Sequence, residues 1–228
     1  MAKIWIGLGV IVVVVGVAAA ALLGAFDRSP PVATATQPAP GSSPGSSPAA
    51  PPPEAGVTAD DRVLGDPDAP VTIIEYASLT CPHCATYHRE TLPKVQAEYI
   101  DAGKVKVVYR DFPLDRVALA AAGLARCVPP ERYFPFLSVL FDSQASWATA
   151  ADPLAALGRL GKTAGLSDEE VARCTTDDAH LDAVLAQRLA GEDRHQIRST
   201  PSFVIGGRTY SGNLTFAQVQ EIVEPLLP

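Results

Sequence analysis

The 228-residue sequence has little charge, little sulfur and few aromatic side chains. It contains one methionine, four cysteines, four histidines and 7% aromatic residues, and only 19% of its residues are charged. The 18 basic and 25 acidic residues leave a net charge of -7, without the cluster of Lys and Arg that a nucleic-acid partner requires. The composition therefore argues against nucleic-acid binding, and the lack of Met-rich or His-rich tracts argues against a dedicated carrier of soft metal ions.

One long hydrophobic run stands at the amino terminus. Residues 4–26 carry no charge. As a helix they would span roughly 34 Å, enough for a bilayer core of about 30 Å. We expect an uncleaved transmembrane signal anchor, and Lys3 favours a cytoplasmic location for residues 1–3. The alternative is a cleaved signal peptide, since small residues at 18–21 and 24–25 could form a cleavage site.

A segment of low complexity follows, over residues 27–57. Between 29 and 56, Pro, Ala, Ser and Gly occupy 23 of 28 positions, in numbers of nine, six, five and three. Such a composition cannot bury enough apolar surface to fold, so we expect a disordered linker. Extended as polyproline II it would reach about 87 Å. Residues 58–228 then form one domain of ordinary size.

The hydrophobic pattern of this domain predicts alternating strands and helices. A β-branched run at 71–76 and a second at 105–109 predict two parallel strands, joined by a helix over 82–101 that kinks at Pro93. Helical periodicity then continues over an inserted block at about 115–192. Two short runs around Gly206-Gly207 predict a hairpin over 203–210, and a final helix starts at Thr215. The fold class is therefore α/β.

The chemistry of the domain centres on Cys81-Pro82-His83-Cys84. Two cysteines with this spacing at a helix start can form a small disulfide, and the helix amino terminus favours a thiolate on the first of them. A zinc site with His83 or His88 is the alternative, although no second C-x-x-C occurs. A c-type haem is excluded because alanine, not histidine, follows Cys84. We therefore expect no metal and no cofactor.

These residues carry a family resemblance. The run from Glu75 to Cys84 (EYASLTCPHC), with Ser199-Thr-Pro-Ser-Phe203 much later, closely resembles the DsbA-like thiol:disulfide oxidoreductases of the bacterial periplasm. The resemblance covers roughly residues 60–228 and implies a thioredoxin-like fold with a helical insertion. It implies that Cys81 is the nucleophile and Cys84 the resolving thiol. It also implies that Pro201 is a cis-proline whose loop pairs with the backbone of a substrate.

The resemblance also suggests roles for the neighbours of the cysteines. His83 matches the histidine between the family's cysteines, where it favours the Cys81 thiolate and the reduced enzyme. Glu75 matches a partly buried acid that exchanges protons with Cys84, although it could instead be a strand-end charge in solvent. Thr200 departs from the valine of the best-known members, which leaves the strength of the oxidant open. His88, His180 and His195 have no obvious partner in the sequence, which favours surface or packing roles.

The function implied by the resemblance is oxidation of exported proteins. The Cys81-Cys84 disulfide would be donated to reduced or unfolded substrates and restored by a quinone-linked membrane partner of the DsbB-like kind. The protein would be a monomer in the bacterial inner membrane, with its catalytic domain in the periplasm. A reductase or isomerase of the same fold is the main alternative. A Cu(I) metallochaperone using the two cysteines is a third possibility.

The remaining cysteines, Cys127 and Cys174, are predicted to form a structural disulfide. Each occupies the end of a predicted helix in the inserted block, so packing could bring them within bridging distance. Two free buried thiols are the alternative. The pairing leaves no cysteine over, which suggests an oxidising compartment.

Overall fold

The computed structural model describes residues 57–228. The predicted cytoplasmic residues 1–3, the transmembrane anchor at 4–26 and all but the last residue of the linker at 27–57 lie outside the described residues. Within 57–228, the structure contains no helix that combines the length and the apolar composition needed to cross a bilayer.

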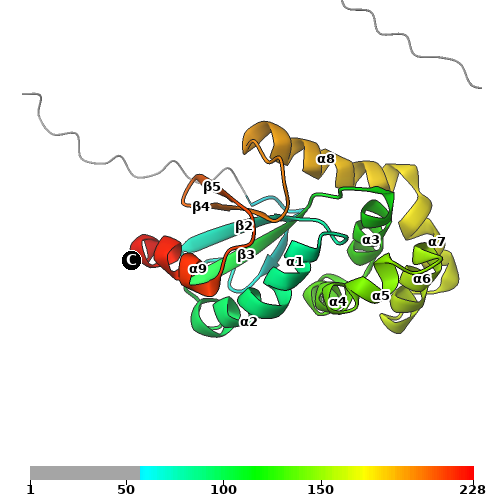
Figure 1. Ribbon diagram of the computed structural model, residues 1–228, viewed down its shortest axis with the longest axis horizontal. Helices are drawn as coiled ribbons and strands as arrows, with labels where there is room; N and C mark the ends of the chain where they lie inside the picture. The colour runs from blue at the N-terminus through cyan, green and yellow to red at the C-terminus, as the bar shows by residue number, and fades with distance from the viewer. Residues whose placement is uncertain (1–56) are drawn as a thin grey trace, which may run out of the picture. The chain divides into compact units, whose positions relative to one another are not determined.

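A five-stranded mixed sheet forms the centre of the domain (Figure 1). The strands are β1 (Arg62–Leu64), β2 (Val71–Ala77), β3 (Val105–Asp111), β4 (Ser202–Ile205) and β5 (Arg208–Ser211), in the spatial order β1-β3-β2-β4-β5. Strands β2 and β3 pair in parallel, and the other neighbours are antiparallel. The parallel pair and the hairpin confirm the predicted topology. The sequence does not predict strand β1, because three half-buried residues show no periodicity.

The helix that follows β2 is continuous but changes its winding. It consists of α1 (Pro82–Thr86), a π-helical turn η1 (Tyr87–Thr91), α2 (Leu92–Val95) and a second π-helical turn η2 (Gln96–Ile100). Pro93, where the sequence predicts a kink, lies at the start of α2 between these two turns. Proline lacks a backbone N–H, and the wider π turns accommodate it without ending the helix. The helical segment ends at Ile100, and the turn that follows contains Gly103, whose φ of 67° favours glycine.

The predicted helical block lies between β3 and β4. It comprises α3 (Arg116–Cys127), α4 (Pro130–Asp142), α5 (Gln144–Ala148), α6 (Pro153–Thr163), α7 (Asp168–Thr176) and α8 (Asp178–Arg194). Asp152 caps α6 and Ser167 forms a capping box with Glu170, as their sequence patterns predict. A second capping box at Thr215 starts α9 (Phe216–Val223), which continues into the short turn η3 (Glu224–Leu226).

Helices cover both faces of the sheet. The segment from α1 to η2 packs with α9 on one face, where Ile73, Val107 and Phe203 meet Val95 and Val219. Helix α8 covers the other face, and its Gly191 lies so close to Tyr76 that a Cβ atom there would be 2.5 Å from the tyrosine ring. Alternate residues of β2 therefore point toward α1 and toward α8.

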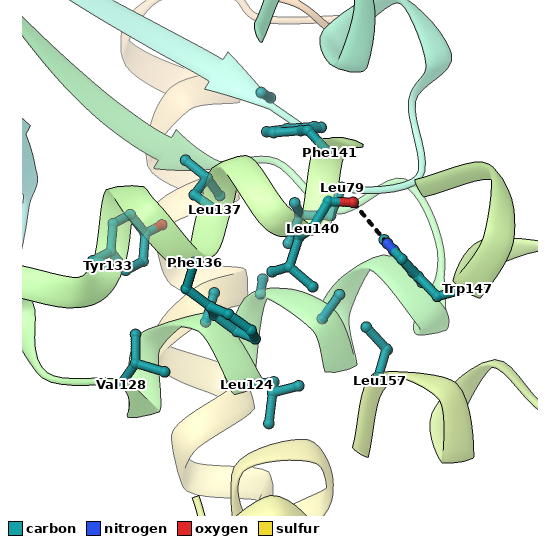
Figure 2. Close-up of a cluster of buried hydrophobic side chains, with 14 of the residues drawn as sticks. Leu79, Leu124, Val128, Tyr133, Phe136, Leu137, Leu140, Phe141, Trp147 and Leu157 are labelled. Atoms are coloured by element: carbon teal, nitrogen blue, oxygen red, sulfur yellow. Dashed lines mark hydrogen bonds between the residues drawn. The ribbon is translucent and has the colours of Figure 1, made fainter. Parts of the chain in front are cut away.

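The helical block has its own buried core, which extends to the two cysteines of the C-x-x-C motif. Figure 2 shows its centre, where side chains of α4 meet Trp147 of α5 and Leu157 of α6. The Trp147 indole donates a hydrogen bond of 2.7 Å to the Leu140 carbonyl, so its one polar atom is satisfied. Because Cys81 and Cys84 belong to the same cluster, the packing of the block bears directly on the site.

Candidate active site

Cys81 stands at the junction between strand β2 and helix α1. The loop that leaves β2 turns with a hydrogen bond from the Cys81 N–H to the Ser78 carbonyl at 3.0 Å, and Cys81 is the N-cap residue of α1. Pro82 occupies the first helical position, where its missing N–H costs nothing. The unpaired amides of this helix start therefore face the Cys81 sulfur.

The Cys81 thiol is strongly acidic. Its pKa is lowered to about 5, chiefly by a hydrogen bond from the Cys84 thiol, against the opposing effect of burial. The backbone amides of Cys84 and His83 lower the pKa further. Cys81 is therefore a thiolate at neutral pH, the form that attacks disulfides.

Cys84 has the opposite character. It is fully buried, and burial is the first cause that raises its pKa far above that of an ordinary thiol. The hydrogen bond to Cys81 and the negative charges of Cys81 and Glu75 act in the same direction. A pair with one ionised and one protonated thiol is the arrangement that a thiol-disulfide exchange centre needs, because one sulfur attacks and the other resolves.

The loop containing Thr200 and Pro201 covers the sulfur of Cys81. The Thr200-Pro201 peptide bond is cis, and the Thr200 carbonyl oxygen lies 3.3 Å from the Cys81 sulfur. Only 5% of Cys81 is exposed. Cys84 has no exposed surface, so Cys81 is the one of the two thiols that a partner can reach. By contrast, Pro82 and His83 are exposed at the rim of the site.

Glu75 lies in the buried interior, not in solvent. It is fully buried on β2, and its carboxylate oxygens are 3.0 and 3.1 Å from Nε2 of His88. His88 is itself buried, so of the surface and packing roles that its lack of a sequence partner favours, it has the packing role. The contact joins β2 to the π-helical turn η1, 13 residues apart. The sequence signal for this contact is the acidic residue within the apolar run of β2, because a buried carboxylate needs a hydrogen-bond partner.

The other two histidines pack within the fold. His180 contacts the Gly123 carbonyl at 2.8 Å and lies 3.7 Å from the sulfur of Cys127. The ring of His195 lies 5.9 Å from that of Tyr76. Both arrangements agree with the packing roles favoured by the sequence.

Gln144 is a second residue that sequence reasoning misses. It is buried at the start of α5, and its side-chain amide donates hydrogen bonds to the carbonyls of Leu79 at 2.8 Å and Cys81 at 3.0 Å. Both carbonyls belong to the loop that positions the nucleophile. The helical block thus holds the active-site loop by two hydrogen bonds, across 63 or more residues of sequence.

The second pair of cysteines is joined in the structure. A disulfide connects Cys127, the last residue of α3, to Cys174 in α7, with the two Cα atoms 6.2 Å apart. Helices α3 and α7 approach closely here, because a Cβ atom added to Gly123 would lie 2.4 Å from the Cys174 carbonyl oxygen. Residues 57–228 contain no group of three or more His, Cys, Asp or Glu side chains placed to hold a metal ion.

A C-x-x-C pair at a helix start, facing a cis-proline loop on a mixed sheet, defines a thiol-disulfide site on a thioredoxin-like fold. A family model described as thioredoxin matches residues 57–225, and the chain belongs to this family, among its DsbA-like members. The crystal structure of alpha-DsbA1 from Wolbachia pipientis is 32% identical, with a TM-score of 0.69, and the match covers 75% of this chain and 92% of that one.

Two curated relatives carry names that agree with this family. A protein of Rickettsia bellii, named as a protein-disulfide oxidoreductase, is 31% identical over 172 residues, which cover 74% of this chain and 66% of the relative. Disulfide bond formation protein D of Bacillus subtilis is 24% identical over 170 residues, covering 71% and 75%. The match spans just under two thirds of the Rickettsia bellii protein.

Proposed function

We propose that this protein is a thiol:disulfide oxidoreductase that introduces disulfide bonds into exported proteins through a Cys81-Cys84 disulfide. The observation that carries the proposal is the opposite ionisation of the two thiols, with the pKa of Cys81 lowered to about 5 and that of Cys84 raised. A stabilised Cys81 thiolate stabilises the reduced protein and so makes its disulfide a strong oxidant. The names and folds of the relatives support the same activity.

The proposed reaction proceeds through a mixed disulfide. A substrate thiolate attacks the Cys81 sulfur, the bond to Cys84 breaks, and Cys84 leaves and takes up a proton. A second substrate thiolate then attacks the sulfur bonded to Cys81, and Cys81 leaves as a stable thiolate. The substrate loses two electrons and the protein gains them. The edge formed by the Thr200-Pro201 loop lies beside the reacting sulfur and is placed to pair with the substrate backbone.

We further propose that the protein works on the outer side of the bacterial inner membrane, anchored by residues 4–26. Its partners would be reduced exported proteins and a DsbB-like oxidase linked to quinone. The pairing of Cys127 with Cys174 supports an oxidising compartment.

The redox potential separates an oxidase from a reductase. After equilibration of the full chain with glutathione buffers in detergent, we expect a reduction potential of about -120 mV, as in strong oxidants. A value near about -270 mV would contradict an oxidase and indicate a reductase. An intermediate value near about -180 mV would favour an isomerase, as the Thr200 departure allows.

Replacing His83 with alanine is expected to make the disulfide less oxidising. Removal of a side chain that favours the thiolate destabilises the reduced form, and we expect a shift on the order of 30 mV, which corresponds to about 1.4 kcal/mol. The same glutathione titration measures it. Lys94→Ala, an exposed change in α2 outside the motif, is the matched control. An unchanged or more oxidising His83→Ala protein would contradict this role.

Cell fractionation tests the proposed topology. We expect the protein in the membrane fraction, with residues 57–228 cleaved by protease added to spheroplasts but protected in intact cells. Recovery of a soluble chain that begins near Ala25 to Ser29 would instead establish cleavage of the hydrophobic run. Protection in spheroplasts would contradict an outward-facing domain.

A further inference from the structure

The buried pair of Glu75 and His88 includes a side chain from the helix that carries the resolving thiol. His88 follows Cys84 by four residues, on the next turn of the same helix, so both side chains share its buried face. Glu75 projects from β2 toward that face, and its charge is one of the causes that raise the pKa of Cys84. Among residues 57–228, His88 is the only hydrogen-bond partner of the Glu75 carboxylate.

The ring of His88 is fixed on three sides. It stacks on Phe141 of α4, with the centroids 4.1 Å apart and the planes at 26°, and contacts Tyr87 and Tyr109 edge to face at 5.9 and 5.8 Å. A ring held in this way presents Nε2 to both carboxylate oxygens in one orientation. Such a contact fixes the direction of the carboxylate.

The groups around the pair restrict which of them can exchange protons. Burial raises the pKa values of Tyr87, Tyr109 and Tyr133 well above the ordinary range, so these hydroxyls stay neutral at working pH. The guanidinium of the neighbouring Arg89 is directed to the Phe141 carbonyl at 3.5 Å. These three hydroxyls therefore do not take up the Cys84 proton.

We propose that His88 is a positioning residue that holds the Glu75 carboxylate in the orientation in which it accepts the proton of Cys84. The inference rests on the proposed oxidoreductase function. It concerns the step in which Cys84 closes the disulfide after Cys81 has formed a mixed disulfide. The Cys84 thiol gives its proton to Glu75, and the Cys84 sulfur attacks the Cys81 sulfur. The bond between Cys81 and its partner then breaks, and the partner leaves as a thiolate with the electron pair.

The test follows this closure in the full-length protein with glutathione disulfide as oxidant. Reduced protein is mixed with the oxidant over a range of pH, quenched with acid, alkylated, and analysed by mass for dithiol, mixed-disulfide and disulfide forms. The first step is attack by Cys81, which is held by the helix start and the Thr200 loop. The second step is closure by Cys84. The two rate constants are obtained separately from the same samples.

Removing the hydrogen bond from His88 should slow only the second step. His88→Phe keeps an aromatic ring against Phe141 but lacks the donor, and we expect closure to slow about 10-fold at pH 7. His88→Gln, which supplies an amide donor, should close within about threefold of the unmodified protein. If His88→Phe does not fold, His88→Leu tests the same loss.

A double variant separates action through Glu75 from an independent effect. Glu75→Gln should slow closure about 100-fold, and adding His88→Phe should slow it no further. Additive losses, a His88→Gln protein that closes as slowly as His88→Phe, or an equal slowing of the first step would each overturn the role of His88. If the unmodified protein fails to react with glutathione disulfide at Cys81, the proposed function itself is wrong, which is a distinct result.

Discussion

The Cys81→Ser protein is expected to oxidise a reduced, unfolded model protein at least about a thousandfold more slowly than the unmodified protein. Serine has no ionised form at neutral pH comparable with a thiol whose pKa is about 5, so no attacking group remains. Loss of free thiols from the model protein measures the activity. Thermal unfolding serves as the control for the fold, because Cys81 and serine differ little in size.

The Cys84→Ser protein should behave differently from the Cys81→Ser protein. It retains the attacking thiol but cannot release a bound partner, so mixed disulfides between Cys81 and substrate should accumulate on non-reducing gels. The pH dependence of Cys81 alkylation in native protein provides a further check, with a midpoint near pH 5. An ordinary midpoint for Cys81, or a lower one for Cys84, would reverse the assignment of the two thiols.

Loss of the Cys127-Cys174 disulfide is expected to cost about 4 kcal/mol of unfolding free energy. The bridge closes a loop of 47 residues, and constraint of the unfolded chain accounts for this amount in the entropy model. For a domain of this size the midpoint of thermal unfolding should fall by about 8 to 16 °C. The measurement compares the Cys127→Ala/Cys174→Ala protein with the unmodified protein.

The control for this prediction is selective reduction. Mild glutathione buffers should open the Cys81-Cys84 disulfide and leave the Cys127-Cys174 bridge closed, because Cys174 is fully buried and remote from the exchange site. Peptide mapping that finds Cys127 and Cys174 free in the oxidised protein, or either of them bonded to Cys81 or Cys84, would contradict the assignment. A loss below about 1 kcal/mol would contradict the predicted stabilisation.

The parts of the site that the sequence predicts are those with local signals. The spacing of Cys81 and Cys84 at a helix start is a local pattern, and the strands, the hairpin and the helix caps follow from short-range periodicity. The family resemblance adds Pro201. These elements are in the structure at the predicted positions, with boundaries that differ by a few residues.

The parts that the sequence does not predict depend on contacts between distant segments. His88 meets Glu75 only because β2 and the π-helical turn η1 face each other, and Gln144 reaches Leu79 across 65 residues. The low exposure of Cys81 results from the Thr200 loop, 119 residues away. No pattern within one segment encodes such contacts, since tertiary packing decides them.

The two hydrogen bonds from Gln144 also limit how this architecture can be simplified. The helical block is inserted between β3 and β4, so its deletion is the obvious way to make a smaller thioredoxin-like domain. The excision would instead leave the Leu79 and Cys81 carbonyls without their donor and uncover the apolar wall around Cys84. An engineer who shortens this protein therefore needs to replace the amide of Gln144 before trimming any helix.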